Sequence, residues 1–245
     1  MKRSFFAALL FLLFAVTAQA AGLQIITENS PPLNYTEDGT DTGKLTGQAV
    51  EIVKEVQKRI QDTTPIEVMP WARGYDLAQK EPGVMLFSTT RTPARENLFQ
   101  WVGPVGTNEW VFIAKKGSPI TINALDDAKK VGTIGAYKND AREQFLKDQG
   151  FTNLDSADKP EDILKKVLSG RNDLWLTDKD EYRVTAKAQN VDPSELTPLF
   201  TVKKTELYMA FSKATLADVV QKWQKAYDDM KADGTYDKIL AQNNK

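Results

Sequence analysis

The chain of 245 residues contains neither cysteine nor histidine. Without thiols and imidazoles it cannot form disulfides, thiolate or imidazole metal sites, or catalytic groups of the Ser-His-Asp and Cys-His kinds. The absence of cysteine also excludes anchoring through a lipid-modified cysteine. Chemistry based on carboxylates is left open.

An excess of charge of one sign is missing too, since 32 lysines and arginines face 33 aspartates and glutamates, for a net charge of −1. This balance favours neither nucleic acid nor an anionic membrane as a partner. Long hydrophobic runs are equally scarce. The apolar run from Phe5 to Val16 is too short for a comfortable membrane span.

The first twenty residues have the three parts of a secretory signal peptide. Met1-Lys2-Arg3 is basic, the apolar run follows, and Ala18-Gln19-Ala20 is a small-residue cleavage site. We therefore expect residues 1–20 to be removed and a periplasmic protein without a lipid anchor to begin at Ala21. The remaining roughly 225 residues suffice for one large domain or two small ones.

Short apolar runs and amphipathic stretches alternate along the rest of the chain. Strands are predicted at 24–27, 66–69, 84–87, 109–114, 130–134, 174–177 and 207–211. Helices are predicted from Gly47 to Ile60 and at 70–79, 139–149, 160–169, 216–232 and 234–243. This alternation indicates an α/β protein with parallel strands and right-handed crossovers.

The stretch from Ser88 to Glu96 is the strongest candidate for a binding site. It follows the apolar run 84–87, and Pro93 can open a helical turn with Thr92 as its N-cap. In open α/β sheets, ligands bind outside the carboxyl ends of the strands. An arginine beside hydroxyls and free backbone N–H groups is suited to bind a carboxylate. The alternative is a surface loop with a solvated arginine.

A second α/β set carries an acidic residue, Asp178, at the end of its buried strand 174–177. If the strand ends of two lobes face each other across a cleft, Arg95 and Asp178 lie at opposite ends of one ligand. A molecule with a carboxylate and an ammonium group fits that arrangement. Asp178 is also suited to be the N-cap of a helix over 179–189, and the two roles are compatible.

Four elements occur in an order typical of a known family. They are Thr90-Arg91-Thr92-Pro93-Ala94-Arg95, the stretch from Phe99 to Pro104, the run from Gly170 to Asp178, and the run from Gly234 to Leu240. The chain resembles a divergent branch of the family 3 extracellular solute-binding proteins of the amino-acid-binding type. The resemblance implies a two-lobed type II periplasmic binding protein fold, in which each lobe is a mixed, mostly parallel sheet flanked by helices, with two hinge crossings. Residues 21–105 and 206–245 would form lobe 1, and residues 106–205 would form lobe 2.

The resemblance also implies roles for individual residues. Arg95, helped by Thr90, would hold the α-carboxylate of the ligand, while the carbonyl of Ser88 and the carboxylate of Asp178 would receive its ammonium group. Trp71 stands where the family often has an aromatic residue against the ligand, although it would serve equally as core filler. The first loop would add Glu28 and Tyr35 to the lining of the pocket.

Departures from the family pattern leave the charge of the ligand open. Ser88 replaces a frequent glycine, and Arg91 is an additional cation. The second-lobe loop supplies Tyr137, Asn139 and Asp140, of which Asn139 or Asp140 can cap the next helix, but Asp140 would repel a carboxylate. Arg91 and Arg73 would favour an acidic ligand side chain, whereas Glu28 and Asp140 would favour a basic one.

The resemblance implies a binding protein that captures a small zwitterion, an amino acid or a derivative, by hinge closure. We expect a monomer, since nothing in the sequence suggests an exposed apolar seam. It would deliver this small-molecule ligand to the membrane permease of an ABC-type importer. We expect no catalytic residue, no metal and no cofactor. Two alternatives stay open: a periplasmic dehydratase-like enzyme on the same fold, with Glu28 or Asp178 as general acid or base, and a stand-alone ligand sensor.

Overall fold

The computed structural model of the chain describes residues 22–37, 40 and 42–243. The signal peptide predicted at residues 1–20 lies outside this part of the chain. Within the described residues, no helix combines the length and the apolar character needed to cross a bilayer.

The strands and helices alternate as expected for an α/β protein. The strands are β1 (Gln24–Thr27), β2 (Tyr35–Thr36), β3 (Leu45–Thr46), β4 (Ile66–Val68), β5 (Val84–Thr90), β6 (Phe99–Lys115), β7 (Ile134–Tyr137), β8 (Leu154–Ala157), β9 (Leu174–Asp178) and β10 (Leu196–Ser212). The α-helices are α1 (Gln48–Ile60), α2 (Trp71–Lys80), α3 (Ala141–Asp148), α4 (Pro160–Leu168), α5 (Glu181–Ala188), α6 (Ala217–Ala232) and α7 (Thr235–Asn243). Short 3₁₀ helices cover Pro93–Arg95, Leu125–Lys130 and Pro193–Glu195.

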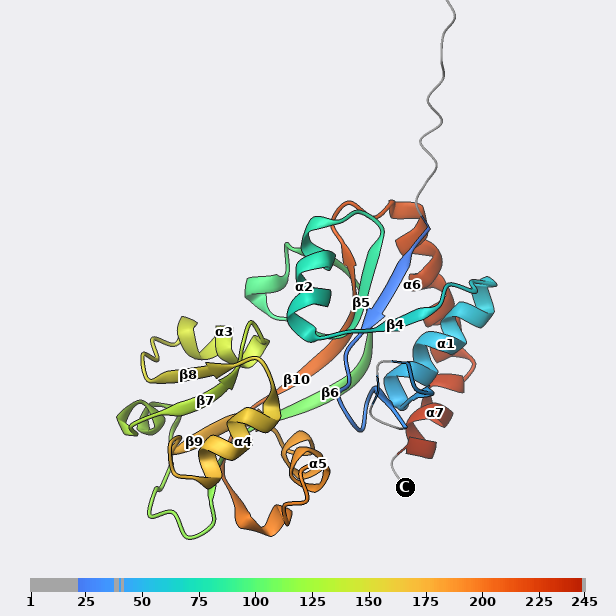
Figure 1. Cartoon of the computed structure of the whole chain (residues 1–245). Coiled ribbons are helices and arrows are strands. Elements are labelled where there is room, and N and C mark those ends of the chain that lie inside the picture. The colour runs from blue at the N-terminus through green and yellow to red at the C-terminus, as the bar shows by residue number, and fades with distance from the viewer. Residues whose placement is uncertain (1–21, 38–39, 41, 244–245) are drawn as a thin grey trace, which may run out of the picture.

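Two long antiparallel strands, β6 and β10, run through both lobes and join them (Figure 1). They make one sheet of eight strands in the order β4-β1-β5-β10-β6-β9-β7-β8. On one side of them β1 pairs in parallel with β4 and β5, and on the other side β7 pairs in parallel with β8 and β9. The predicted fold, with two mixed, mostly parallel lobes and two hinge crossings, is confirmed. The exact lobe boundaries stay a prediction.

Helices cover both faces of the first lobe, α2 on one side of β5 and α1, α6 and α7 on the other (Figure 1). The alternation of strand residues explains this. Met85 and Phe87 of β5 pack with α1 and α6, while Leu86, between them, packs with α2. The predicted helical spacing of Val50, Val53 and Val56 in α1 places all three in this core.

Several predicted elements differ from the structure. Residues 125–130 form a 3₁₀ helix, and β7 begins only at Ile134, whereas a strand was predicted at 130–134. A strand over Gly135 escapes propensity arguments, since glycine is a weak strand former. Glycine is required at position 135 because a Cβ atom there would lie 2.3 Å from the side chain of Ile163. Strands β6 and β10 are also much longer than predicted because they pair with each other across the hinge.

The two predicted helix starts near the site are partly wrong. Arg95 ends a 3₁₀ turn instead of lying inside a helix, and Thr92 precedes that turn without a capping side-chain hydrogen bond. Asp178 is not the N-cap of the next helix, since α5 begins at Glu181 and Asp180 occupies the cap position. The turn 178–180 extends the chain by two residues before the helix starts.

Gly47, at the N-cap of α1, fixes the loop that borders the lobe interface. Its φ is +113°, and a Cβ atom would lie 2.4 Å from the carbonyl oxygen of Leu33. We expect Gly47→Ala to lower the free energy of unfolding by more than the roughly 1–3 kcal/mol of backbone strain alone. Gly117→Ala is the control in urea unfolding, since Gly117 also has positive φ (+78°) but no atom near its Cβ position. Equal losses for the two variants would contradict the contact with Leu33.

Candidate functional site

Arg95 is a buried cation at the interface between the lobes. Its side chain is 1% exposed, its Nε donates to Oε1 of Gln144 at 3.0 Å, and its Nη2 donates to the carbonyl of Asn139 at 3.3 Å. Among the residues that the structure describes, no acidic side chain lies within ion-pair distance of it, and its Nη1 has no hydrogen-bond partner. Burial lowers the pKa of Arg95 because it penalises the charged form.

Aromatic rings of α2 form the wall behind Arg95. The guanidinium carbon lies 4.6 Å from the ring centre of Tyr75 and 5.3 Å from that of Trp71, within the range of cation–π attraction. The two rings stack on each other at 5.2 Å. Packing on aromatic faces explains how a charged side chain is held in place without a carboxylate.

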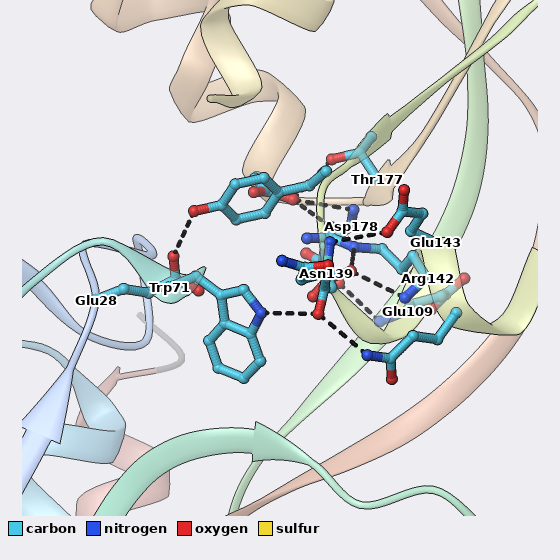
Figure 2. Close-up of polar contacts among 12 residues, drawn as sticks. Glu28, Trp71, Glu109, Asn139, Arg142, Glu143, Thr177 and Asp178 are labelled. Atoms are coloured by element: carbon cyan, nitrogen blue, oxygen red, sulfur yellow. Dashed lines mark hydrogen bonds and ion pairs between the residues drawn. The ribbon is translucent and has the colours of Figure 1, made fainter. Parts of the chain in front are cut away.

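The backbone carbonyl of Asn139 accepts hydrogen bonds from the first lobe. This oxygen accepts hydrogen bonds from Nε1 of Trp71 at 3.1 Å and from Arg95, and Figure 2 shows the tryptophan contact. Asn139 has a φ of +60°, a conformation that asparagine tolerates better than most residues. Its N–H donates to Glu143 at 2.8 Å, which holds the loop in this shape. The predicted site residue therefore acts through its backbone.

Glu28, directly after β1, reaches across the interface to the end of β7. The hydroxyl of Tyr137 donates to its Oε2 at 3.2 Å. Loss of contact with water raises the pKa of Glu28 to about 8, and the nearby carboxylates of Glu181 and Asp140 add to the effect. Two predicted site residues thus meet each other across the cleft.

Two further acidic side chains surround Arg142. The sequence analysis did not identify Arg142 as a site residue. Asp140 caps α3 by accepting from the N–H of Arg142 at 2.9 Å, and it also accepts from Nε of Arg142 at 2.5 Å. Nη1 of Arg142 donates to Glu181, which also accepts from the hydroxyl of Thr177 at 2.8 Å. A signal did exist: a cation in the first turn of a helix is disfavoured by the helix dipole and needs acidic partners. Glu181 carried no comparable signal.

Asp178 lies at the hinge, at the end of β9. Its Oδ2 accepts from the N–H of Glu109 at 2.8 Å, and its Oδ1 accepts from the N–H of Asp180 at 2.9 Å. Figure 2 places it beside Arg142 and opposite Glu28 and Trp71. Burial raises its pKa. It borders a small cavity of about 50 Å³ that Arg142 and Glu181 also line, and a larger one of about 760 Å³ on the hinge.

Residues 23–244 match the family described as bacterial extracellular solute-binding proteins, family 3. The chain belongs to this family. The L-cystine-binding protein TcyA of Bacillus subtilis (strain 168) is 26% identical over 209 residues, which cover 84% of this chain and 75% of that protein.

Solved structures share the fold. An ancestral arginine-binding protein bound to arginine superposes with a TM-score of 0.73 at 22% identity, covering 91% of this chain and 98% of that one. A histidine kinase sensor domain with similarity to periplasmic binding proteins gives 0.77 at 15% identity, covering 90% of this chain and 96% of that one.

The hydroxyl-bearing residues 88–90 form the last part of β5 instead of following it. Ser88 has a φ of +59°, and its hydroxyl is buried without a hydrogen-bond partner in the described part of the chain. Thr90, 5% exposed, ends the strand opposite Leu207 of β10. Both residues precede the 3₁₀ turn that carries Arg95.

Three predicted site residues lie apart from the residues at the lobe interface described above. Arg91 forms an ion pair with Glu96 at 2.6 Å, stacks on Trp101 and Tyr208, and borders the larger hinge cavity. Arg73 is exposed on α2. Tyr35 lies in β2, paired with Thr46 of β3.

Proposed function

We propose that this family 3 protein captures a small α-amino acid or derivative between its lobes, with Arg95 binding the carboxylate. The observation that carries the proposal is the burial of Arg95 with an unpaired Nη1 and with no carboxylate within ion-pair distance among the described residues. Buried charges are normally paired, because a lone charge loses its hydration without compensation. The carboxylate of the ligand is the partner that completes the site.

Other features support a ligand of this class. The stacked rings of Trp71 and Tyr75 offer an apolar wall, and the free hydroxyl of Ser88 offers a hydrogen-bond donor. The relative in Bacillus subtilis is a binding protein for L-cystine, and the solved relatives include an ancestral protein bound to arginine.

Ligand entry on this proposal requires the lobes to separate. Four of the hydrogen bonds described above join them: Trp71 to Asn139, Tyr137 to Glu28, and Arg95 to both Gln144 and Asn139. Strands β6 and β10 act as the hinge, and the lobes close again on the ligand. The ligand carboxylate then replaces the weaker carbonyl contact of Arg95 with a charge-assisted bond.

The proposed setting is the periplasm, after removal of residues 1–20, with an ABC-type importer as the partner that reads the closed form. A stand-alone sensor is the second candidate. It is supported by a histidine kinase sensor domain that has the same fold. We propose no catalytic role.

A thermal-shift screen tests the capture of amino acids. The protein is unfolded and refolded to remove any co-purified ligand, then mixed with amino acids, small peptides, polyamines and aromatic acids. A ligand at about a hundred times its dissociation constant adds about 2.7 kcal/mol of stability, a shift of several degrees for a chain of this size. Closure should also reduce the radius of gyration in small-angle scattering. Shifts caused by compounds without a carboxylate, and not by amino acids, would refute the role of Arg95.

A further inference from the structure

Glu143 is a buried carboxylate of α3 to which the proposed function gives no role. The residue is 2% exposed. Its Oε2 accepts from the N–H of Asn139 at 2.8 Å, while its Oε1 accepts from the hydroxyl of Ser156 and forms an ion pair with Lys147 at 2.8 Å. Burial acts to raise the pKa of Glu143, but these three partners outweigh it and hold the pKa below its usual value. Glu143 is therefore ionised at neutral pH and keeps its full strength as an acceptor.

The bond from Asn139 to Glu143 stabilises an unfavourable backbone conformation. Asn139 has a φ of +60°, which residues other than glycine adopt only when local interactions hold them there. The residue is exposed, so packing of its side chain does not supply this stabilisation. Glu143 fixes its N–H, and the next residue, Asp140, is the N-cap of α3. Asn139 is thus attached to α3 on both sides, and the direction of its carbonyl follows from that.

This carbonyl is the point at which the first lobe contacts α3. It accepts from Nε1 of Trp71 at 3.1 Å and from Nη2 of Arg95 at 3.3 Å, in addition to Nε2 of Gln144 at 3.3 Å. Trp71 is 3% exposed, and its indole N–H, which is a donor only, needs an acceptor when buried. Rotation of the backbone at Asn139 would leave both donors of the first lobe without this acceptor.

We propose that Glu143 is a positioning residue for lobe closure. It acts through Asn139, whose carbonyl it aims at the first lobe, and the contacts made there stabilise the closed form before a ligand binds. The inference rests on the proposed function in one respect, that the lobes open and close about β6 and β10. A closed form that is already populated lowers the cost of ordering the site when the ligand arrives.

A simpler role for Glu143 is to cap the first turn of α3. Capping alone would make loss of Glu143 lower the stability of the protein without changing how the lobes sit against each other. The two roles therefore differ in the balance of closed and open molecules, and they agree in the melting temperature.

Pulsed electron resonance on the refolded, ligand-free protein measures that balance. Spin labels are attached at Lys80→Cys and Asp148→Cys, exposed positions at the ends of α2 and α3, and the chain has no other cysteine. The parent should show a closed population. Glu143→Met should lower the ratio of closed to open molecules at least about fivefold, the factor that one ordinary hydrogen bond represents. Glu143→Gln should stay within about twofold of the parent, because its amide oxygen still accepts from Asn139.

Ser156→Ala is the matched control. It removes the other hydrogen bond of Glu143 and leaves the one from Asn139 in place. We expect a lower melting temperature in both Ser156→Ala and Glu143→Met, but more open molecules only in Glu143→Met. A parent without a closed population, an unchanged ratio in Glu143→Met, or equal opening in Ser156→Ala would overturn the inference.

Hydrogen exchange in the unmodified protein decides the matter if Glu143→Met does not fold. The backbone N–H of Asn139 should exchange slowly, because its bond to Glu143 lies within α3 and the preceding loop and survives opening of the lobes. Exchange at the rate of a free amide would refute the inference.

The proposed function and this inference fail in different ways, because these measurements need no ligand. If no α-amino acid binds but Glu143→Met opens the lobes, only the proposed function is wrong. If amino acids bind and Glu143→Met leaves the lobes as in the parent, only the role of Glu143 is wrong.

Discussion

Arg95→Met is expected to lose amino-acid binding without destabilising the ligand-free protein. Binding should weaken by at least about 2 kcal/mol, because the carboxylate of the ligand would be buried without its partner. Stability should stay level or rise by about 1–4 kcal/mol, the usual result when an apolar side chain replaces a poorly compensated buried charge. Methionine keeps the packing on Trp71 and Tyr75.

Titration calorimetry and urea unfolding of the ligand-free protein measure these two effects. Arg91→Met is the matched control, because Arg91 is an arginine in a partly exposed ion pair, where replacement changes stability by about 1 kcal/mol or less. Unchanged binding in Arg95→Met would refute Arg95 as the carboxylate receptor. A loss of several kcal/mol of stability would show that Arg95 already has a sufficient structural partner.

The stability of the ligand-free protein is expected to decrease from pH 5.5 to pH 9 through Glu28. Its pKa is about 8 in the folded protein and 4.5 as a free side chain, so between these values the folded state binds a proton that the unfolded state has released. Stability from this group is therefore complete below pH 4.5 and is lost as the pH rises through 8. Since Glu28 keeps some exposure, the loss is about 2–4 kcal/mol.

Glu28→Gln should flatten this dependence and leave the variant more stable than the parent at pH 9. Thermal unfolding of both proteins across pH 5.5–9 provides the measurement. Asp233 has the opposite dependence, since its hydrogen bond from Arg59 lowers its pKa, and its contribution lies below this pH range. Parallel curves for parent and variant would show that Glu28 titrates normally.

The order of strands and helices could be predicted because it rests on local patterns. The spacing of Val50, Val53 and Val56 identifies α1 wherever the chain folds. The lengths of β6 and β10 could not be predicted, since residues 103–108 become a strand only by pairing with β10. Strand pairing between distant segments has no local signature.

The site was predicted in part for the same reason. Arg95, Asp178 and Glu28 stand at ends of recognisable strands or turns, and Tyr137 lies in the loop predicted after 130–134. The structure places them at or beside the lobe interface. Arg142 and Glu181 enter the interface only through the relative placement of α3 and α5. Arg91 shows the converse, because its neighbour Glu96 neutralises a charge that appears free in the sequence.

Strand β10 has a consequence for how the protein folds. It pairs with β5 of the first lobe, yet it follows β5 in the chain by about a hundred residues. Contacts between such distant segments make folding slow, and until they form, β5 presents an open edge suited to aggregation. The order of synthesis therefore differs from the order of folding. The N-terminal strand β5 reaches its native pairing only after the later segment β10 has been synthesised.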